Sequence, residues 1–328
     1  MAELRAGLLG VGMMGRHHAR VLRELPGVEL VAIADPGGDP HGVAGDLPIL
    51  PDIDALIAAG IDVAVVAVPT RFHEDAALRL AEAGVHTLVE KPIADSVEAG
   101  QRMVDAFAAK GLVGAVGHIE RFNPALQELR RRLEAGDLGD VYQIATRRQG
   151  PFPSRIADVG VGKDLASHDI DLTAWVAQST YATVFAQTAH KSGREYEDMV
   201  TATGRLANGT VVSHLVNWLS PMKERVTIVT GERGAFVADT STGDLTFYAN
   251  GTIPLEWESV SSFRGVSEGD VIRYAFAKRE PLRVEHENFR DAVLGEQTDV
   301  VTMEQGLRTL AVVEGMLDSA RTGTAVTF

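Results

Sequence analysis

The feature that most constrains this chain is the segment GVGMMG at residues 10–15, which matches the pattern G-x-G-x-x-G. An apolar run at residues 6–10 leads into it, and a helical pattern follows at residues 15–25. In a strand–turn–helix unit the first glycine permits a tight turn, the second lets the backbone approach a pyrophosphate, and the third lets helix and strand pack closely. N–H groups at the start of the helix then point at the phosphates. The sequence therefore predicts a dinucleotide site at Gly10, Val11, Gly12, Met13, Met14 and Gly15.

Asp35 ends the next apolar run, twenty residues after Gly15. An acidic residue at this spacing accepts hydrogen bonds from the hydroxyls of an adenosine ribose, and its charge repels a 2′-phosphate. Pro36 and Gly37 follow it, so that no arginine stands ready for such a phosphate. We therefore predict NAD rather than NADP as the cofactor. The structural alternative is an aspartate that caps a turn at the strand end.

Strand-like and helix-like segments alternate through the first third of the chain. The strands show little polar alternation, which is typical of a parallel sheet covered by helices on both faces. Because crossovers between parallel strands are nearly always right-handed, we predict a doubly wound Rossmann domain with its ligand beyond the carboxyl ends of the strands. The expected strands are 6–10, 29–35, 61–68, 85–90 and 113–117, and the expected helices are 15–25, 53–59, 72–83 and 96–110.

The pattern changes after a helix expected at residues 124–134. Alternating segments follow one another, and Asn208-Gly209 between two of them is a strong hairpin signal. We predict a C-terminal α+β domain with a large, mostly antiparallel open sheet, which divides the chain into residues 1–122 and 123–328. The expected strands are 141–148, 183–191, 198–206, 210–218, 225–230, 235–239 and 245–248, and the expected helices are 164–176, 281–295 and 303–320.

Composition limits the partners of this chain. The formal net charge of −14 opposes broad attraction to nucleic acid or to an anionic membrane. The chain has no cysteine, which excludes disulfides and thiolate chemistry, and no other ligand spacing supports a metal site. It opens without a secretory signal and has no apolar stretch of the roughly 20 residues that cross a bilayer. We expect a cytoplasmic protein with a small-molecule substrate.

The strand expected at 61–68 ends in residues that we predict to line the nicotinamide side of the site. These are Val68, Pro69 and Thr70, and Thr70 is also a candidate N-cap for the next helix. His73 follows on the first helical turn. It is either a wall of the cofactor pocket or a surface residue.

Glu90 ends the strand at 85–90 and Lys91 follows it, and we predict that both contact the cofactor. Pro92 restricts Lys91 to extended geometry. A lysine that is partly desolvated beside a cofactor can polarise a carbonyl or take part in proton transfer. The alternative is a solvent-exposed lysine without a chemical role.

Asp164 and His168 form a second candidate pair, one turn apart on the helix expected at 164–176. A histidine accepts a proton from an alcohol near neutral pH, and a nearby carboxylate stabilises the imidazolium that results. The structural alternative is a helix-capping aspartate and a satisfied core histidine.

A third group lies where the two predicted domains should meet. Asn123 followed by Pro124 also fits a helix N-cap, which is a purely structural use. The predicted substrate-binding residues are His118, Glu120, Arg121, Asn123, Arg155 and Lys163.

In their order and spacing, the glycine motif, Glu90-Lys91-Pro92 and the helix of Asp164 and His168 resemble the glucose-fructose oxidoreductase/inositol dehydrogenase (Gfo/Idh/MocA) family over nearly the whole chain. The resemblance implies a Rossmann domain, a C-terminal domain with a large open sheet, and dimers or tetramers that associate through that sheet. It also implies Lys91, Asp164 and His168 as the catalytic set.

Within the family, residues 118–124 and 155–171 look most like enzymes that oxidise the 3-hydroxyl of UDP-N-acetylglucosamine. Lys163 stands where an apolar residue is expected, and it is a candidate contact for an anionic group. The resemblance implies an NAD-dependent dehydrogenase that acts on a secondary alcohol of a sugar. The alternatives are a dehydrogenase of inositol or of a free sugar, and a dinucleotide-binding regulatory sensor without catalysis.

Overall fold

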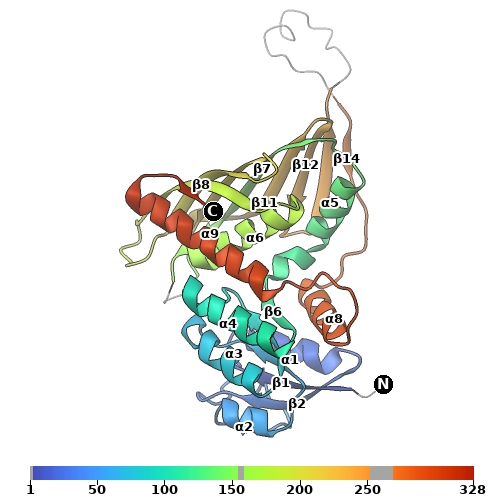
Figure 1. Cartoon of the computed structure of the whole chain (residues 1–328). Coiled ribbons are helices and arrows are strands. Elements are labelled where there is room, and N and C mark those ends of the chain that lie inside the picture. The colour runs from blue at the N-terminus through green and yellow to red at the C-terminus, as the bar shows by residue number, and fades with distance from the viewer. Residues whose placement is uncertain (1–2, 154–158, 252–268) are drawn as a thin grey trace, which may run out of the picture. The chain divides into compact units, whose positions relative to one another are not determined.

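The computed structural model describes residues 3–153, 159–251 and 269–328, and contacts group the chain into two compact units (Figure 1). The first unit is Met1–Ile119 with Glu280–Ala311, and the second is Glu120–Arg279 with Val312–Phe328. The predicted division into residues 1–122 and 123–328 assigns both C-terminal helices to the second domain. In the structure, contacts place Glu280–Ala311 in the first unit. The helical period of such a segment shows that one face is buried, but not against which sheet.

The first unit contains the predicted parallel sheet. Its strand order is β3-β2-β1-β4-β5-β6, and every neighbouring pair is parallel. The order reverses between β1 and β4, which is the place where doubly wound folds bind nucleotides. The strands are β1 (Leu4–Leu9), β2 (Val28–Ala34), β3 (Ile49–Leu50), β4 (Val63–Val66), β5 (His86–Glu90) and β6 (Gly114–Gly117).

Helices cover this sheet through an apolar core that includes Leu8, Ile33, Val65 and Leu88. Helix α1 packs on β1 and β2 and also on α8, whose Phe289 belongs to the same core. Helix α3 packs on β4 and β5 and on α4. The helices of this unit are α1 (Gly15–Glu24), α2 (Ile53–Ala58), the 3₁₀ turn η1 (Thr70–Phe72), α3 (His73–Glu82), α4 (Val97–Lys110) and α8 (Pro281–Val293), with the first half of α9 (Met303–Thr322).

Helix ends show where local sequence decided the structure. The Asn123 side chain accepts a hydrogen bond from the Ala125 N–H at 3.1 Å, and Pro124 is the first residue of its helix, which confirms the predicted cap. The predicted N-cap at Thr70 is wrong. Thr70 begins η1, whereas α3 begins at His73 after Phe72, which makes no side-chain cap bond. The 3₁₀ turn separates Thr70 from the N–H groups that it would have capped.

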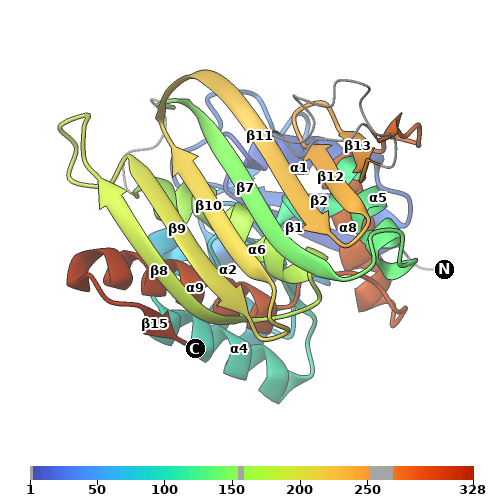
Figure 2. The same cartoon turned by 90° about the horizontal axis from the view of Figure 1, so that it is seen from above.

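The second unit contains the predicted open sheet. Its nine strands follow the order β14-β13-β12-β11-β7-β10-β9-β8-β15, and all pairs are antiparallel except β7 and β10 (Figure 2). The strands are β7 (Val141–Pro151), β8 (Tyr181–Ala189), β9 (Met199–Leu206), β10 (Val211–Asn217), β11 (Leu219–Gly231), β12 (Gly234–Asp239), β13 (Asp244–Ala249), β14 (Val271–Arg273) and β15 (Val326–Thr327). β11 starts well before the expected residue 225, and β14 and β15 were not predicted.

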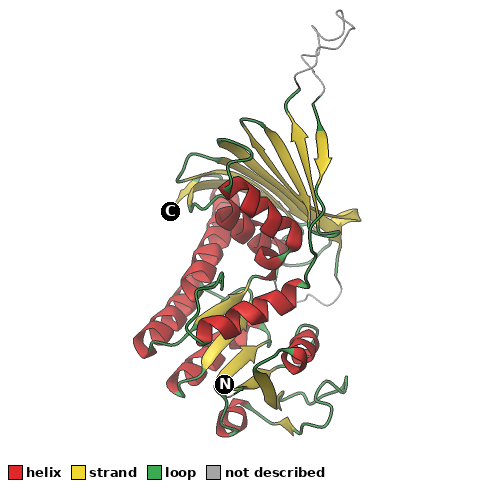
Figure 3. Ribbon diagram, turned by 90° about the vertical axis from the view of Figure 1, so that its right-hand side faces the viewer, coloured by secondary structure: helices red, strands yellow, loops and turns green. Residues whose placement is uncertain are grey.

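Helices line one face of this sheet, which forms a single twisted layer of strands (Figure 3). Helix α5 (Pro124–Glu134) packs on β12 and β13, and α6 (Ser167–Val176) packs on β7. The helix expected from Asp164 differs in its first turn, because Gly162–Ala166 forms a π-helix, labelled η3, before α6. Of the helices in the described ranges, none combines the length and the apolar character that crossing a bilayer requires.

Candidate active site

The glycine segment shows which of its glycines the fold itself requires. Gly10 has φ 96°, and a Cβ at Gly15 would lie 2.0 Å from the Gly10 carbonyl oxygen, so both positions exclude a side chain. A Cβ at Gly12 would meet no atom within 4 Å. The protein's own packing therefore does not require a glycine at residue 12, whereas close approach of a pyrophosphate to the backbone would require one.

Asp35 is tied to the same segment. Its Oδ2 accepts a hydrogen bond from the Val11 N–H at 2.9 Å, and its Oδ1 accepts one from the Gly37 N–H at 2.8 Å. A carboxylate has about four acceptor positions, so these two bonds leave capacity for ribose hydroxyls. The aspartate thus caps the turn after β2, and its contact with a ribose stays a prediction.

His73 is buried, and the surface position that was one of its two predicted alternatives is wrong. The side chain is 1% exposed, and Nδ1 and Nε2 lie 3.0 and 2.9 Å from the carbonyl oxygens of Pro92 and Val68. Burial lowers the pKa of His73. The ring connects the segments that follow β4 and β5. Its predicted contact with the cofactor stays a prediction, as do those of Val68, Pro69 and Thr70.

Glu90, at the end of β5, contacts a residue that sequence reasoning missed. Its Oε1 lies 2.9 Å from His18 Nε2, and its Oε2 accepts a hydrogen bond from the Lys91 N–H at 3.1 Å. His18 also contacts His286, whose Nε2 lies 2.8 Å from His18 Nδ1. No local pattern connects residues 18, 90 and 286, so only the fold reveals this contact.

Asp164 and His168 lie on consecutive elements of the second unit. Asp164 is 6% exposed and belongs to the π-helix, whereas half-buried His168 belongs to the first turn of α6. The spacing argument for a shared α-helical face therefore does not apply to this pair as predicted. π-helical turns occur often at functional sites.

Glu197 fixes the start of this π-helix, and sequence reasoning missed it as well. Its Oε1 accepts a hydrogen bond from the Gly162 N–H at 2.8 Å, and its backbone carbonyl accepts one from the Val161 N–H at 3.1 Å. A Cβ at Gly160 would lie 2.1 Å from the same Oε1, so the glycine leaves room for the carboxylate. These contacts set the path of the backbone that leads into Asp164.

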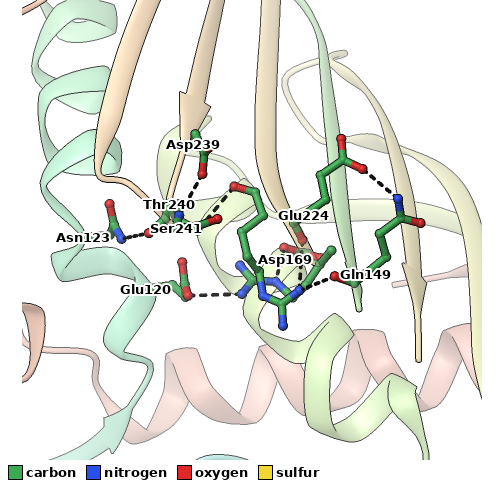
Figure 4. A network of polar contacts seen from close by, with 10 residues as sticks. Glu120, Asn123, Gln149, Asp169, Glu224, Asp239, Thr240 and Ser241 are labelled. Carbon is green, nitrogen blue, oxygen red and sulfur yellow. Dashed lines mark hydrogen bonds and ion pairs between the residues drawn. The ribbon is translucent and has the colours of Figure 1, made fainter. Parts of the chain in front are cut away.

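Two of the predicted substrate residues have structural partners inside the second unit. Arg121 donates two hydrogen bonds to Asp171, at 2.7 and 2.6 Å, and these residues are 5% and 1% exposed. Asn123 caps α5 and also donates to the Thr240 carbonyl at 2.9 Å (Figure 4). A direct contact of either residue with substrate stays a prediction.

Glu120 belongs to a buried ionic cluster with Arg148 and Asp169 (Figure 4). Arg148 donates to Glu120 at 3.1 Å and to Asp169 at 2.9 Å. Burial opposes ionisation of both carboxyls, yet Arg148 holds the pKa of Glu120 below its usual value, whereas burial raises the pKa of Asp169. The charges of Arg148 and Arg225 favour ionisation of both carboxyls, and they outweigh burial only at Glu120.

Three predicted substrate residues remain, namely His118, Lys163 and Arg155. His118 is 1% exposed and belongs to the first unit. Lys163, on the π-helix, forms an ion pair with Glu314 of α9 at 3.2 Å. Arg155 lies outside the described residues.

Family models match both parts of the chain. A model described as an oxidoreductase family with an NAD-binding Rossmann fold matches residues 4–118, and one described as the GFO/IDH/MocA C-terminal domain matches residues 126–237. The chain belongs to the Gfo/Idh/MocA family. It is an NAD-dependent dehydrogenase of this family, and the open space at Gly12 together with the carboxylate of Asp35 fits NAD.

Several members of the Gfo/Idh/MocA family are similar over the chain. UDP-N-acetylglucosamine 3-dehydrogenase from Acidithiobacillus ferrooxidans is 31% identical over 316 residues, which cover 95% of each chain. A solved structure of that enzyme covers 98% of this chain and 99% of its own, with a TM-score of 0.85 and 27% identity. The scyllo-inositol 2-dehydrogenase of Bacillus subtilis is 32% identical over 184 residues, which are 53% of this chain and 54% of the relative.

A further solved structure shares the fold. The WlbA dehydrogenase from Bordetella pertussis, solved in complex with NADH and UDP-GlcNAcA, has a TM-score of 0.80 and 24% identity, and covers 99% of both chains.

Proposed function

We propose that this dehydrogenase transfers a hydride between nicotinamide and a secondary alcohol of a nucleotide sugar, with the 3-hydroxyl of UDP-N-acetylglucosamine or a close analogue as the reacting group. The observation that supports this proposal is the similarity to UDP-N-acetylglucosamine 3-dehydrogenase, which extends over 95% of both chains. The similarity to the scyllo-inositol enzyme extends over about half of each chain, and an inositol 2-dehydrogenase of Saccharopolyspora erythraea is similar over 98% of this chain at the lower identity of 28%. An inositol is therefore the second candidate.

The reaction assigns separate tasks to three side chains. NAD, when bound, accepts the hydride from the carbinol carbon. His168 takes the hydroxyl proton, and Asp164 orients the imidazole or stabilises its positive charge. Lys91 donates a hydrogen bond to the reacting oxygen and stabilises the negative charge that develops there. Exchange of the roles of Lys91 and His168 satisfies the same balance of protons.

Replacement of Lys91 by alanine tests this assignment. We expect turnover, followed by NADH absorbance at 340 nm, to fall about 10²-fold or more, because the oxygen loses its charge-stabilising donor. The Kd for NAD should change little. Lys110→Ala is the matched control, since this lysine lies at the far end of α4 and pairs with Glu82 at 3.2 Å. Unchanged turnover of Lys91→Ala would remove Lys91 from the mechanism.

A substrate panel separates the candidate functions. UDP-N-acetylglucosamine, free N-acetylglucosamine, scyllo-inositol and myo-inositol are each incubated with the enzyme and NAD. Reduction of NAD by the nucleotide sugar alone supports the proposal, and reduction by an inositol supports the second candidate. NAD binding with no turnover of any polyol in a wider panel would support the sensor alternative.

The substrate contacts of the second unit also have a test. Lys163→Met removes the ammonium that pairs with Glu314. If Lys163 contacts a phosphate or carboxylate of the substrate, KM for the nucleotide sugar should rise while the Kd for NAD stays constant.

We also propose a homo-oligomer that associates through the nine-stranded sheet. Alternate residues of the central strands are half-buried on the face opposite the helices, among them Ala145, Leu215 and Ile228. Light scattering of the native chain and of Ile228→Asp tests this assignment, because a charge in a subunit contact should shift the mass toward the monomer.

A further inference from the structure

Two buried histidines and the partly buried Glu90 form a connected line beside Lys91. Glu90 Oε1 lies 2.9 Å from His18 Nε2, and His18 Nδ1 lies 2.8 Å from His286 Nε2. The two histidines are 0% and 1% exposed. The line joins the end of β5 to α1 and α8, which pack against each other (Figure 1). All three residues belong to the first unit.

The second oxygen of Glu90 is also fixed. Its Oε2 accepts the hydrogen bond from the Lys91 N–H at 3.1 Å. Gly117 is paired with Glu90 in the neighbouring strand, and a Cβ at Gly117 would lie 3.3 Å from the carboxyl carbon and Oε2. The glycine therefore leaves the space that the carboxylate fills, and the orientation of the carboxylate is set from three sides.

The donors and acceptors of the line are mutually compatible. Burial opposes ionisation of Glu90, but the hydrogen bond and charge of His18 and the charge of Lys91 together lower its pKa. Nε2–H of His18 donates to the Glu90 carboxylate, and of the facing pair His18 Nδ1 and His286 Nε2 one nitrogen donates and the other accepts. Burial holds the pKa of His286 well below its usual value, so that this outer ring is neutral.

Packing alone does not explain this line. Apolar side chains of the same volume fill a core without the desolvation cost of a buried charge. The charge lies instead on the residue that precedes Lys91. Without the His18 donor, Glu90 Oε1 would lose its hydrogen bond to His18 Nε2. The next residue in the chain, Lys91, carries the ammonium that could replace this donor. Attraction between the two charges in a low-dielectric site would draw the ammonium toward Glu90.

We propose that His18, supported by His286, is a positioning residue that occupies the Glu90 carboxylate and thereby keeps the Lys91 ammonium directed at the substrate oxygen. This inference rests on the proposed function, in which Lys91 stabilises the charge on that oxygen. His18 itself touches neither substrate nor reacting atoms in this assignment.

Two amide substitutions separate the two contacts of His18. Glutamine carries its amide nitrogen near the position of Nε2, so His18→Gln retains a donor toward Glu90 and loses the contact with His286. Asparagine carries its amide near the position of Nδ1, so His18→Asn loses the contact with Glu90. We expect His18→Asn to lower kcat about 10- to 100-fold, because a small misplacement of a catalytic group has effects of this size. We expect His18→Gln to retain most of kcat.

His17 provides the matched control, since it is the neighbouring residue on the same helix, is half-buried and lies outside the line. His17→Asn should leave kcat, KM and the Kd for NAD near the values of the native enzyme. A structural role of His18 would instead lower the amount of folded protein and leave kcat per folded molecule equal in His18→Asn and His18→Gln.

A measurement that needs no turnover separates this inference from the proposed function. Reductive methylation with ¹³C-formaldehyde labels lysines, and the Lys91 signal is assigned by its loss in Lys91→Arg. We expect this signal to shift in His18→Asn and to keep its native position in His18→Gln and His17→Asn. If the native enzyme oxidises no sugar, the proposed function fails, and this comparison still decides the inference.

His286 supplies a second variant pair in case His18→Asn does not fold. His286→Asn removes the contact with His18 Nδ1, whereas His286→Gln retains an amide near Nε2. We expect a smaller loss of kcat and a smaller shift of the Lys91 signal in His286→Asn than in His18→Asn. The inference is overturned if neither kcat nor the Lys91 signal changes in the asparagine variants, or if glutamine and asparagine act alike.

Discussion

Gly12→Ala should weaken NAD binding and leave folding unchanged, whereas Gly15→Ala should lower the stability of the fold. A Cβ at Gly12 meets no protein atom within 4 Å, and the residue is exposed, so Gly12→Ala should fold like the native chain. A Cβ at Gly15 would lie 2.0 Å from the Gly10 carbonyl oxygen. Gly15→Ala should therefore be destabilised even without NAD.

The geometry sets the size of both effects. Cβ contacts under 3.0 Å are essentially absent from real structures, so the backbone near Gly15 must move by about 1 Å, and overpacking of this kind costs about 1–3 kcal/mol. At Gly12 the methyl group occupies the space of a closely bound pyrophosphate, and we expect NAD to bind at least about tenfold more weakly. At an NAD concentration of about 100 times the native Kd, ligand stabilisation then falls from about 2.7 to about 1.4 kcal/mol.

Thermal unfolding with and without NAD, together with calorimetric titration of NAD, measures both quantities. Gly12→Ala should match the native Tm without NAD to within the equivalent of about 0.5 kcal/mol. It should then lose about half of the stabilisation that NAD provides. Native NAD affinity in Gly12→Ala, or a loss of stability without NAD equal to that of Gly15→Ala, would refute the assignment of the open space at Gly12 to the cofactor.

Two further predictions concern the second unit. Asp171→Asn leaves the buried Arg121 without its charged partner and should cost about 3–5 kcal/mol in chemical denaturation, whereas the double variant Arg121→Met/Asp171→Leu should cost much less; equal costs would contradict a strong buried pair. Burial opposes ionisation of Asp198, but hydrogen bonds from Ser192 and from the Lys191 N–H hold its pKa below the usual value. The contribution of Asp198 to the stability of the fold is therefore present above about pH 4 and is lost as the pH falls through the pKa of the folded state. Asp198→Asn should therefore flatten the acid limb of a plot of Tm against pH, and an unchanged acid limb would exclude this contribution.

The sequence predicted most of the first unit because its signals are local. Each strand is an apolar run between a helix and a turn, and the run at 63–66 is fully buried as expected. The hairpin at Asn208-Gly209 was predicted for the same reason. The signal consists of two adjacent residues, and Gly209 has the positive φ of 91° that such a turn requires. Short strands such as β3 and β15, with two residues each, carry no such period.

The parts of the candidate site that the sequence did not reveal depend on distant contacts. Arg121 and Asp171 are fifty residues apart, and only the fold shows that they pair. His18 and His286 are separated by 268 residues. A buried histidine and an exposed one have the same letter in a sequence, and burial depends on which helices pack together.

Because Gly162–Ala166 forms a π-helix, the direction of the Asp164 side chain relative to His168 depends on the number of residues in this turn. Hydrogen bonds to the fifth residue accommodate one more residue than an ordinary α-turn does. Deletion of one residue here would let a regular helix run back from α6, and every side chain before the deletion would swing by about 100° around the axis. Insertion or deletion of one residue can thus change the direction of the Asp164 carboxylate relative to the His168 imidazole without a substitution of either residue.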